Sequence, residues 1–281
     1  MGQGLTLVGC GDSWAWGTEL IDRTEIKGND WDFGLHHTPL NKKYREDHRY
    51  LKLFSDKIDA KEFVDLSQGG SSNDSIVRKL FRWLSFEGYL SGRDTSNLFV
   101  SIGWTSPERK DFCYNQERPG WDGGWFTIYP MWNHDYNISD LNQFRDIYIS
   151  RLWTAEEYMN RWITQVWQTQ MLLKSLGIRF VMHQAFYHHY MEKFEEWSDE
   201  KFRSEHYNSQ SNLSDLKMWE AIDDITFMHK DDPNKGTFYS YIKDVSVNNS
   251  KDVFYTSHPN ELGHQLWANY MHKYCLENNL L

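Results

Sequence analysis

The chain has 281 residues, of which 40% are hydrophobic and 16% aromatic, a composition that supports a packed core and excludes a disordered chain. Its formal net charge of −10, with no compensating basic run, argues against nucleic acid as a partner. No stretch of about 18 apolar residues is present, and the first residues lack a basic-then-apolar pattern. We therefore expect a soluble protein without a signal peptide and without a membrane partner.

The N-terminal stretch predicts a buried strand that leads into an exposed serine. Residues 5–8 are apolar and end in a glycine turn, Gly9-Cys10-Gly11, after which Asp12 and Ser13 follow at once. In open α/β sheets, ligands bind at the carboxyl ends of the strands. A serine at this point suits a nucleophile, provided that a base takes its proton.

The next part of the chain predicts a helix, a strand and a second helix. Residues 44–58 have apolar residues at helical spacing, and residues 62–67 form a short strand pattern. That strand ends in a turn at Gly69-Gly70, followed by a helical pattern over residues 76–84 with serine or asparagine as its cap. Gly70 is either a simple turn residue or a source of a backbone N–H aimed at developing negative charge.

The remaining regular elements follow the same alternation of strands and helices. We predict them at residues 97–103 (strand, ending at glycine), 141–176 (helix, with Thr154 as a candidate break), 178–183 (strand) and 260–276 (helix). Two segments without a clear period, near 111–140 and 185–250, are interpreted as aromatic-rich loop insertions. Since no repeat or linker divides the chain, we predict one domain over residues 1–281.

Histidines and cysteines give no reason to expect a metal or a cofactor. The pairs His36-His37 and His188-His189, and His183 near the second pair, lack further ligands at suitable spacing. The three cysteines are far apart in the sequence and form no metal or redox motif. One histidine is more informative: His258, followed by Pro259 and Asn260, is the candidate base for Ser13.

Three blocks in this order resemble those of the SGNH hydrolases, also called the GDSL esterase family. They are Gly11-Asp12-Ser13, the run Gly70-Ser-Ser-Asn-Asp74, and His258-Pro259-Asn260 with His264 downstream. The resemblance implies an α/β fold: a three-layer α/β/α architecture with a flavodoxin-like parallel sheet. It also implies roles for residues: Ser13 as nucleophile, His258 as base, and the N–H groups of Gly70 and Ser13 as oxyanion donors.

The chain departs from the family pattern at two positions. The family's third block carries an asparagine that donates to the oxyanion, whereas here Thr105 stands in its place and can donate only from a shorter hydroxyl arm. The family also has an aspartate three residues before its histidine, where this chain has Tyr255. We therefore predict a Ser13–His258 dyad, with Ser257 or a backbone carbonyl on the far imidazole nitrogen and Asp252 exposed. The Trp-Thr variant is similar to members known from bacteriophages.

The sequence thus predicts a serine esterase that removes a small acyl group, such as acetyl, from a glycan or another small-molecule ester. Indole rings stack on sugar faces, and six tryptophans fall near the expected loop face, although packing within the insertions explains them equally well. They are Trp14, Trp16, Trp104, Trp121, Trp125 and Trp132. The alternative is a glycan-binding or structural protein on the same scaffold without catalysis. The acyl group, the oligomeric state and the compartment, cytoplasm or virion, stay open.

Overall fold

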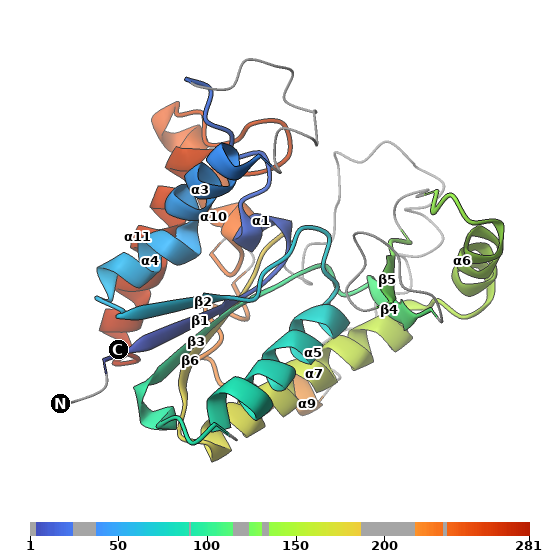
Figure 1. Ribbon diagram of the computed structural model, residues 1–281, viewed down its shortest axis with the longest axis horizontal. Helices are drawn as coiled ribbons and strands as arrows, with labels where there is room; N and C mark the ends of the chain where they lie inside the picture. Colours follow the sequence, from blue (N-terminus) through green and yellow to red (C-terminus); the bar gives the residue numbers. More distant parts are fainter. Residues whose placement is uncertain are drawn as a thin grey trace.

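A parallel four-stranded sheet forms the centre of the protein (Figure 1). The computed structural model describes residues 4–24, 38–89, 91–114, 124–130, 135–186, 217–232 and 235–281. The sheet consists of β1 (Thr6–Cys10), β2 (Glu62–Asp65), β3 (Leu98–Trp104) and β6 (Arg179–Gln184), in the order β2-β1-β3-β6. This is the strand order of flavodoxin-like sheets. The predicted fold class is confirmed.

The two central strands are buried along their whole length. Every residue of β1 and of β3 is inaccessible or nearly so, as expected for a parallel sheet that is covered on both faces. In the register of the sheet, Gly9 lies between Asp65 of β2 and Ser101 of β3. The carboxyl ends of the strands therefore share one edge, and the loops that follow them gather there.

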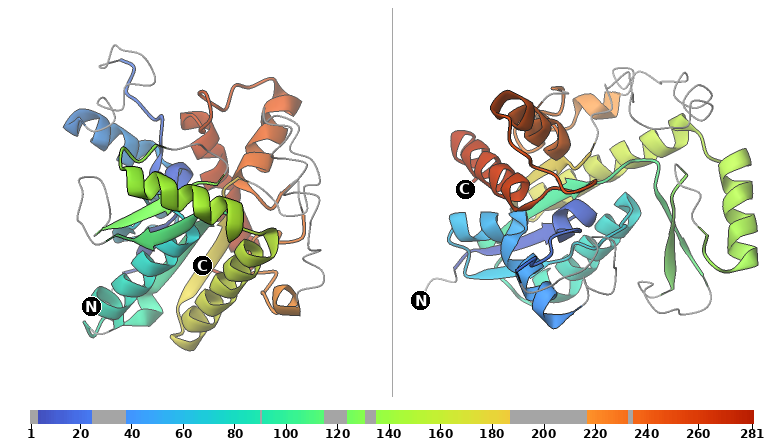
Figure 2. Two further views of the ribbon diagram at one scale, coloured as in Figure 1. Left: turned by 90° about the vertical axis from the view of Figure 1, so that its right-hand side faces the viewer. Right: turned by 90° about the horizontal axis from the view of Figure 1, so that it is seen from above.

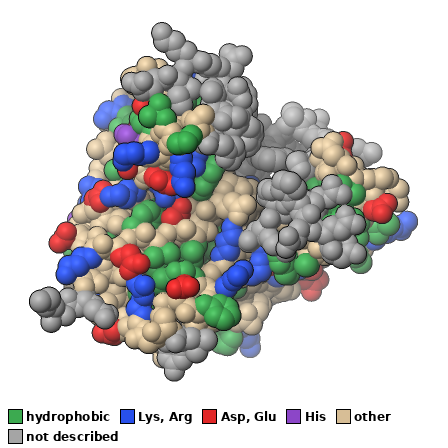
Figure 3. Space-filling model, in the orientation of Figure 1, with side chains coloured by type: hydrophobic (Ala, Val, Ile, Leu, Met, Phe, Trp, Pro, Cys, Tyr) green, Lys and Arg blue, Asp and Glu red, His purple; other side chains and the backbone are tan. Residues whose placement is uncertain are grey.

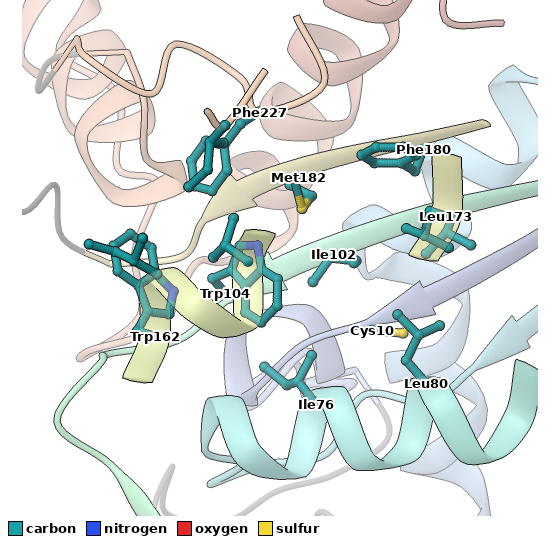
Figure 4. Packing of buried hydrophobic residues seen from close by; sticks show 14 of the residues in the cluster. Cys10, Ile76, Leu80, Ile102, Trp104, Trp162, Leu173, Phe180, Met182 and Phe227 are labelled. Carbon is teal, nitrogen blue, oxygen red and sulfur yellow. The ribbon is translucent and has the colours of Figure 1, made fainter. Parts of the chain in front are cut away.

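Helices cover both faces of this sheet (Figures 1 and 2). On one face lie α4 (Tyr50–Lys57), α10 (Phe238–Asn249) and α11 (Glu261–Glu277), and on the other lie α5 (Asn73–Trp83) and α7 (Ala155–Ser175). Each face has its own hydrophobic cluster. Figure 4 shows the cluster between the sheet and helices α5 and α7, in which Ile76 and Leu80 of α5 point toward the sheet beside Cys10 and Ile102.

The helix boundaries follow from local capping chemistry. Ser72, Thr154 and Asn260 each accept a hydrogen bond from a backbone N–H in the first turn of the helix that follows. Thr154 thus separates α6 (Ser139–Arg151) from α7, as the sequence predicted. Thr237 caps α10 in the same way, although this helix was not predicted inside the expected insertion at 185–250.

The helix predicted over residues 44–58 is in fact two helices. It is divided into α3 (Pro39–His48) and α4 because Arg49 has an extended backbone, with φ −73° and ψ 150°. The break frees the N–H of Tyr50, which donates to His264 Nδ1 at 3.2 Å. The Arg49 guanidinium, almost fully buried, pairs with Asp65 at the end of β2. Both contacts are long-range, so the periodicity alone did not reveal the break.

Several shorter elements complete the described fold. They are α1 (Ser13–Trp16), η1 (Leu84–Tyr89), η2 (Thr95–Asn97), α9 (Lys217–Glu220), and a hairpin of β4 (Lys110–Cys113) with β5 (Trp125–Ile128). The hairpin is antiparallel and lies beyond the end of α5, with α6 outside it (Figures 1 and 2). It falls within the segment 111–140 that was interpreted as an insertion on the loop face.

Acidic and basic side chains are interspersed on one face of the molecule. On the face seen in Figure 3, Lys and Arg lie among Asp and Glu rather than in a patch of one sign. Helices α3 and α4 contribute pairs one turn apart, such as Lys43 with Asp47. Pairs of this exposed kind are screened by water and contribute little to stability. Within the described ranges, no helix combines the length and the apolar character that a membrane crossing needs.

Candidate active site

The nucleophile candidate sits on a sharp turn between β1 and a helix of one turn. Asp12 is fully buried and caps α1, because its Oδ1 accepts the Trp14 N–H at 3.0 Å. Ser13 is the first residue of α1 and is 9% exposed. Gly11 has no room for a side chain, since a Cβ there would lie 2.4 Å from that of Ala15. This close approach lets Ser13 stand at the carboxyl edge of the sheet.

His258 comes to this serine from the far end of the chain. Its Nε2 lies 3.0 Å from Ser13 Oγ, within hydrogen-bond reach. The loop that carries it is fixed on both sides: the Tyr255 N–H donates to the His258 carbonyl, and Asn260 caps α11. The Trp14 ring packs near the imidazole, with 6.3 Å between ring centroids. The structure therefore brings together the two residues that the sequence paired.

A carboxylate that the sequence analysis missed completes the arrangement. Glu19 Oε1 lies 3.2 Å from His258 Nδ1, and the Glu19 side chain is 6% exposed. The same carboxylate accepts hydrogen bonds from the backbone N–H groups of Thr256, Ser257 and His258. It also accepts from the hydroxyls of Thr256 and Ser257. Glu19 thus binds both the imidazole and the loop that carries it.

Glu19 reaches this position through a strained turn. The chain reverses after α1 at Gly17, with φ +81°, and Glu19 itself has φ +70°, an unusual value for a residue with a side chain. A left-handed conformation costs about 1–2 kcal/mol in a residue other than glycine. Burial raises the pKa of Glu19, but hydrogen bonds from His258 and Thr256 outweigh it and lower the pKa to about 2. The group is therefore a carboxylate at neutral pH.

The predicted dyad is corrected by this carboxylate. Asp252 is exposed, as predicted, and does not take part. Ser257 Oγ does lie 3.0 Å from His258 Nδ1, as predicted. The expectation that no buried carboxylate approaches the imidazole was wrong, because Glu19 does so. Its signal in the sequence was weak: an acid six positions after Ser13, in no motif of the family.

Gly70 lies in a turn packed against α1. The Ser71 N–H donates to Gln68 O at 3.3 Å and closes the turn, and Gly70 has φ +76°, as at the third position of a type II turn. The Gln68 N–H donates to Gly11 O, which holds the turn beside the nucleophile. Within the described part of the chain, the N–H groups of Gly70 and Ser13 donate to no other residue.

Thr105 does not offer its hydroxyl to the site. The hydroxyl donates to Asp12 Oδ2 at 2.6 Å, and the residue is 3% exposed. Its backbone is held by Asn73, whose Nδ2 donates to Thr105 O and whose Oδ1 accepts the Thr105 N–H. The bond to Asp12 speaks against the expectation that Thr105 replaces the family's oxyanion asparagine, which stays a prediction. The single proton of the Thr105 hydroxyl is used to satisfy a buried carboxylate.

The other histidines of the described core are not candidates for the base. His183 and His264 are fully buried, and burial lowers the pKa of each to about 3. His183 Nε2 lies 3.2 Å from the Tyr50 hydroxyl. Both residues are thus neutral parts of the core beneath the site. In the described ranges no three His, Cys, Asp or Glu residues are grouped as metal ligands; His36-His37 and His188-His189 lie outside them.

The tryptophans proposed for sugar stacking have different environments. Trp14 and Trp104 are 2% and 1% exposed, so neither can stack on a substrate. Trp16 and Trp125 are half-buried, each with an arginine guanidinium over its ring, at 3.7 Å and 4.1 Å from the centroid. Trp121 and Trp132 lie outside the described residues. The structure corrects the interpretation for the two core residues.

Solved structures with which the chain can be superposed include several esterases. The esterase EstA from Pseudoalteromonas sp. is 11% identical, with 97% of each chain covered and a TM-score of 0.43. The acetyl xylan esterase AlAXEase is 12% identical, with 96% of this chain and 98% of that chain covered and a TM-score of 0.41. A lipolytic protein of the G-D-S-L family from Veillonella parvula is 12% identical, with 98% of this chain and 97% of that chain covered and a TM-score of 0.43.

Comparison by sequence gives a family but no curated relative. No curated protein matches the chain. A family model described as "Family of unknown function (DUF6071)" matches residues 34–280, which is most of the chain and includes the turn at Gly70 and the loop of His258. The chain belongs to this family, DUF6071.

Proposed function

We propose that this protein is a serine hydrolase that cleaves carboxylic esters with a Ser13–His258–Glu19 triad. The observation that carries the proposal is the pair of contacts on one imidazole, 3.0 Å from Nε2 to Ser13 Oγ and 3.2 Å from Nδ1 to Glu19 Oε1. A base that is oriented by a third group and lies within reach of a hydroxyl is the arrangement that activates serine.

The proposed reaction has two halves. Ser13 Oγ attacks the ester carbonyl while His258 Nε2 takes the hydroxyl proton, and the Glu19 carboxylate stabilises the imidazolium that forms. The N–H groups of Ser13 and Gly70 donate to the oxyanion of the tetrahedral intermediate. His258 then returns the proton to the leaving alcohol, and an acyl-serine remains. Water, deprotonated by the same imidazole, hydrolyses this acyl-enzyme and restores Ser13.

For the substrate we propose a small acyl group, such as acetyl, on a carbohydrate. The support is the resemblance of the three sequence blocks to esterases. A series of p-nitrophenyl esters from acetate to octanoate tests the acyl length, and acetate release from acetylated oligosaccharides tests the alcohol. The bacteriophage resemblance of Trp104-Thr105 stays a prediction.

The decisive test is a fluorophosphonate probe together with p-nitrophenyl acetate hydrolysis. We expect covalent labelling at Ser13, and loss of both labelling and turnover in Ser13→Ala and His258→Gln. Equal rates for the wild type and Ser13→Ala would contradict the proposal. They would favour a non-catalytic glycan-binding scaffold, for which the occupied Thr105 hydroxyl is the supporting observation.

A further inference from the structure

The β4–β5 hairpin contacts the turn of Gly70 through the two residues just beyond its paired strands. Lys110 pairs with Ile128, so Arg109 and Tyr129 stand opposite each other at the end of the hairpin. The Tyr129 hydroxyl donates to Gly70 O at 2.6 Å. Arg109 Nη1 donates to Ser71 O at 3.1 Å. Two successive carbonyls of the turn are thus held by one hairpin.

The hairpin is itself fixed to the start of α5, next to this turn. Asp111 of β4 is 6% exposed and accepts hydrogen bonds from Ser72 Oγ at 2.6 Å and from Arg78 Nη1 at 2.9 Å. Its backbone N–H donates to Asp74 Oδ2 at 2.9 Å. Since Ser72 and Asp74 belong to the first turn of α5 and its cap, the hairpin and the helix form one support behind the Gly70 turn.

This support matters because the site has few oxyanion donors. The Thr105 hydroxyl donates to Asp12. The backbone N–H groups of Ser13 and Gly70 must therefore stabilise the negative charge on the substrate oxygen. The Gly70 N–H belongs to the central peptide of the turn, and rotation of that peptide, which converts a type II into a type I turn, points the N–H away. Glycine resists such rotation less than any other residue. A fixed N–H therefore needs an external contact.

Arg109 adds an electrostatic contribution at the same place. Its Nη1 lies 3.7 Å from Oδ2 of Asp12, a fully buried carboxylate directly before the nucleophile. An unpaired negative charge there would oppose the negative charge that develops on the substrate oxygen. The guanidinium offsets it, and it lies against the Tyr129 ring, 5.4 Å from the centroid. Arg109 is 8% exposed, so little water screens this pair.

We propose that the β4–β5 hairpin clamps the Gly70 turn in its donating conformation, with Tyr129 as the positioning residue. The proposal rests on the hydrolase function above and adds a second part of the chain to it. Tyr129 acts through Gly70 and does not touch the reacting atoms. Removing its hydroxyl releases the Gly70 carbonyl, which belongs to the Gly70–Ser71 peptide. With that peptide free to shift, the backbone on both sides of Gly70 is less fixed. The Gly70 N–H then binds the oxyanion less well, while the ground-state ester binds as before.

A matched control is offered by Tyr136, which contacts the same hairpin from outside it. The Tyr136 hydroxyl donates to Thr127 O at 2.5 Å, and both tyrosines are half-buried, so Tyr136→Phe removes the same kind of bond as Tyr129→Phe. We expect Tyr129→Phe to lower kcat by about 10- to 100-fold, somewhat less than the loss of a whole oxyanion donor, while KM changes less than about twofold. The rate of fluorophosphonate labelling should fall in parallel. Tyr136→Phe should retain kcat and lose a similar amount of thermal stability.

Hydrogen–deuterium exchange separates this proposal from the proposed function. In a peptide covering residues 68–72, Tyr129→Phe should exchange faster than the wild type, and Tyr136→Phe should not. If the wild type is active and the two variants have equal kcat, the clamp is overturned and the hydrolase stands. If the wild type neither labels nor turns over, the hydrolase falls, and the catalytic role of the clamp falls with it even where exchange is faster.

Discussion

The Glu19 carboxylate lies 3.2 Å from Nδ1 of His258, although 239 positions separate the two residues in the chain. Glu19 follows Ser13 by six positions, so the proposed nucleophile and acid come from one short segment, helix α1 and the turn at Gly17. The base reaches both from the C-terminal loop. In this arrangement the acid does not lie on the loop of the histidine. It holds that loop by accepting hydrogen bonds from three of its backbone N–H groups.

Replacing Glu19 by glutamine should lower kcat by about 10²- to 10⁴-fold with little change in KM, because the imidazole loses its orienting carboxylate and the imidazolium its counter-charge. Steady-state kinetics on p-nitrophenyl acetate measure this. Asp252→Asn is the control, since Asp252 is exposed and its Oδ1 accepts the Phe254 N–H. Full activity in Glu19→Gln would return the site to a Ser13–His258 dyad.

The same carboxylate makes stability depend on acid pH. In the folded protein the pKa of Glu19 is lowered from 4.5 to about 2, so the unfolded chain takes up the proton first as the pH falls. The contribution of Glu19 to stability is complete above its unfolded pKa and is lost as the pH falls to about 2. The difference in unfolding midpoint between wild type and Glu19→Gln should shrink across this window. A difference that is constant with pH would exclude this linkage.

Thr105→Val should lower the free energy of unfolding more clearly than it lowers kcat. It removes the donor at 2.6 Å from the buried Asp12 carboxylate, and a buried acceptor that loses its partner costs about 1–3 kcal/mol. Thr105→Ser keeps the hydroxyl and should lose less. Urea denaturation measures the difference between the two variants. Unchanged stability together with a kcat about 100-fold lower would instead make Thr105 an oxyanion donor.

Gly70→Ala should reduce turnover by about 10²-fold, the loss expected when one oxyanion donor is misplaced. The residue has φ +76°, and a Cβ would lie 2.6 Å from the Tyr129 hydroxyl, so the turn must change. Gly69→Ala is the matched control: its φ is not positive, and its Cβ would meet Trp16 at an ordinary 3.4 Å. Equal kcat values for the two variants would show that the Gly70 N–H is not used.

The features of the fold that depend on short-range chemistry were predictable from the sequence. The apolar runs that end in glycine became β1 and β3, and the capping residues Ser72 and Thr154 set the starts of α5 and α7. Caps, glycine turns and hydrophobic runs act within a few residues of themselves, so a linear pattern contains them. The parallel fold class followed from their alternation.

The pairing of polar side chains could not be predicted from the sequence, because it depends on the three-dimensional fold. Glu19 had no motif to mark it, and its role depends on a loop near the other end of the chain. Thr105 stood at a suggestive position, yet its hydroxyl belongs to Asp12. From the sequence, Trp14 and Trp104 could equally have faced a ligand or the core, and in the fold both are buried. A buried donor needs an acceptor, and the acceptor can come from any part of the chain that the fold brings near. Sequence patterns, which act over a few residues, do not reveal such pairs.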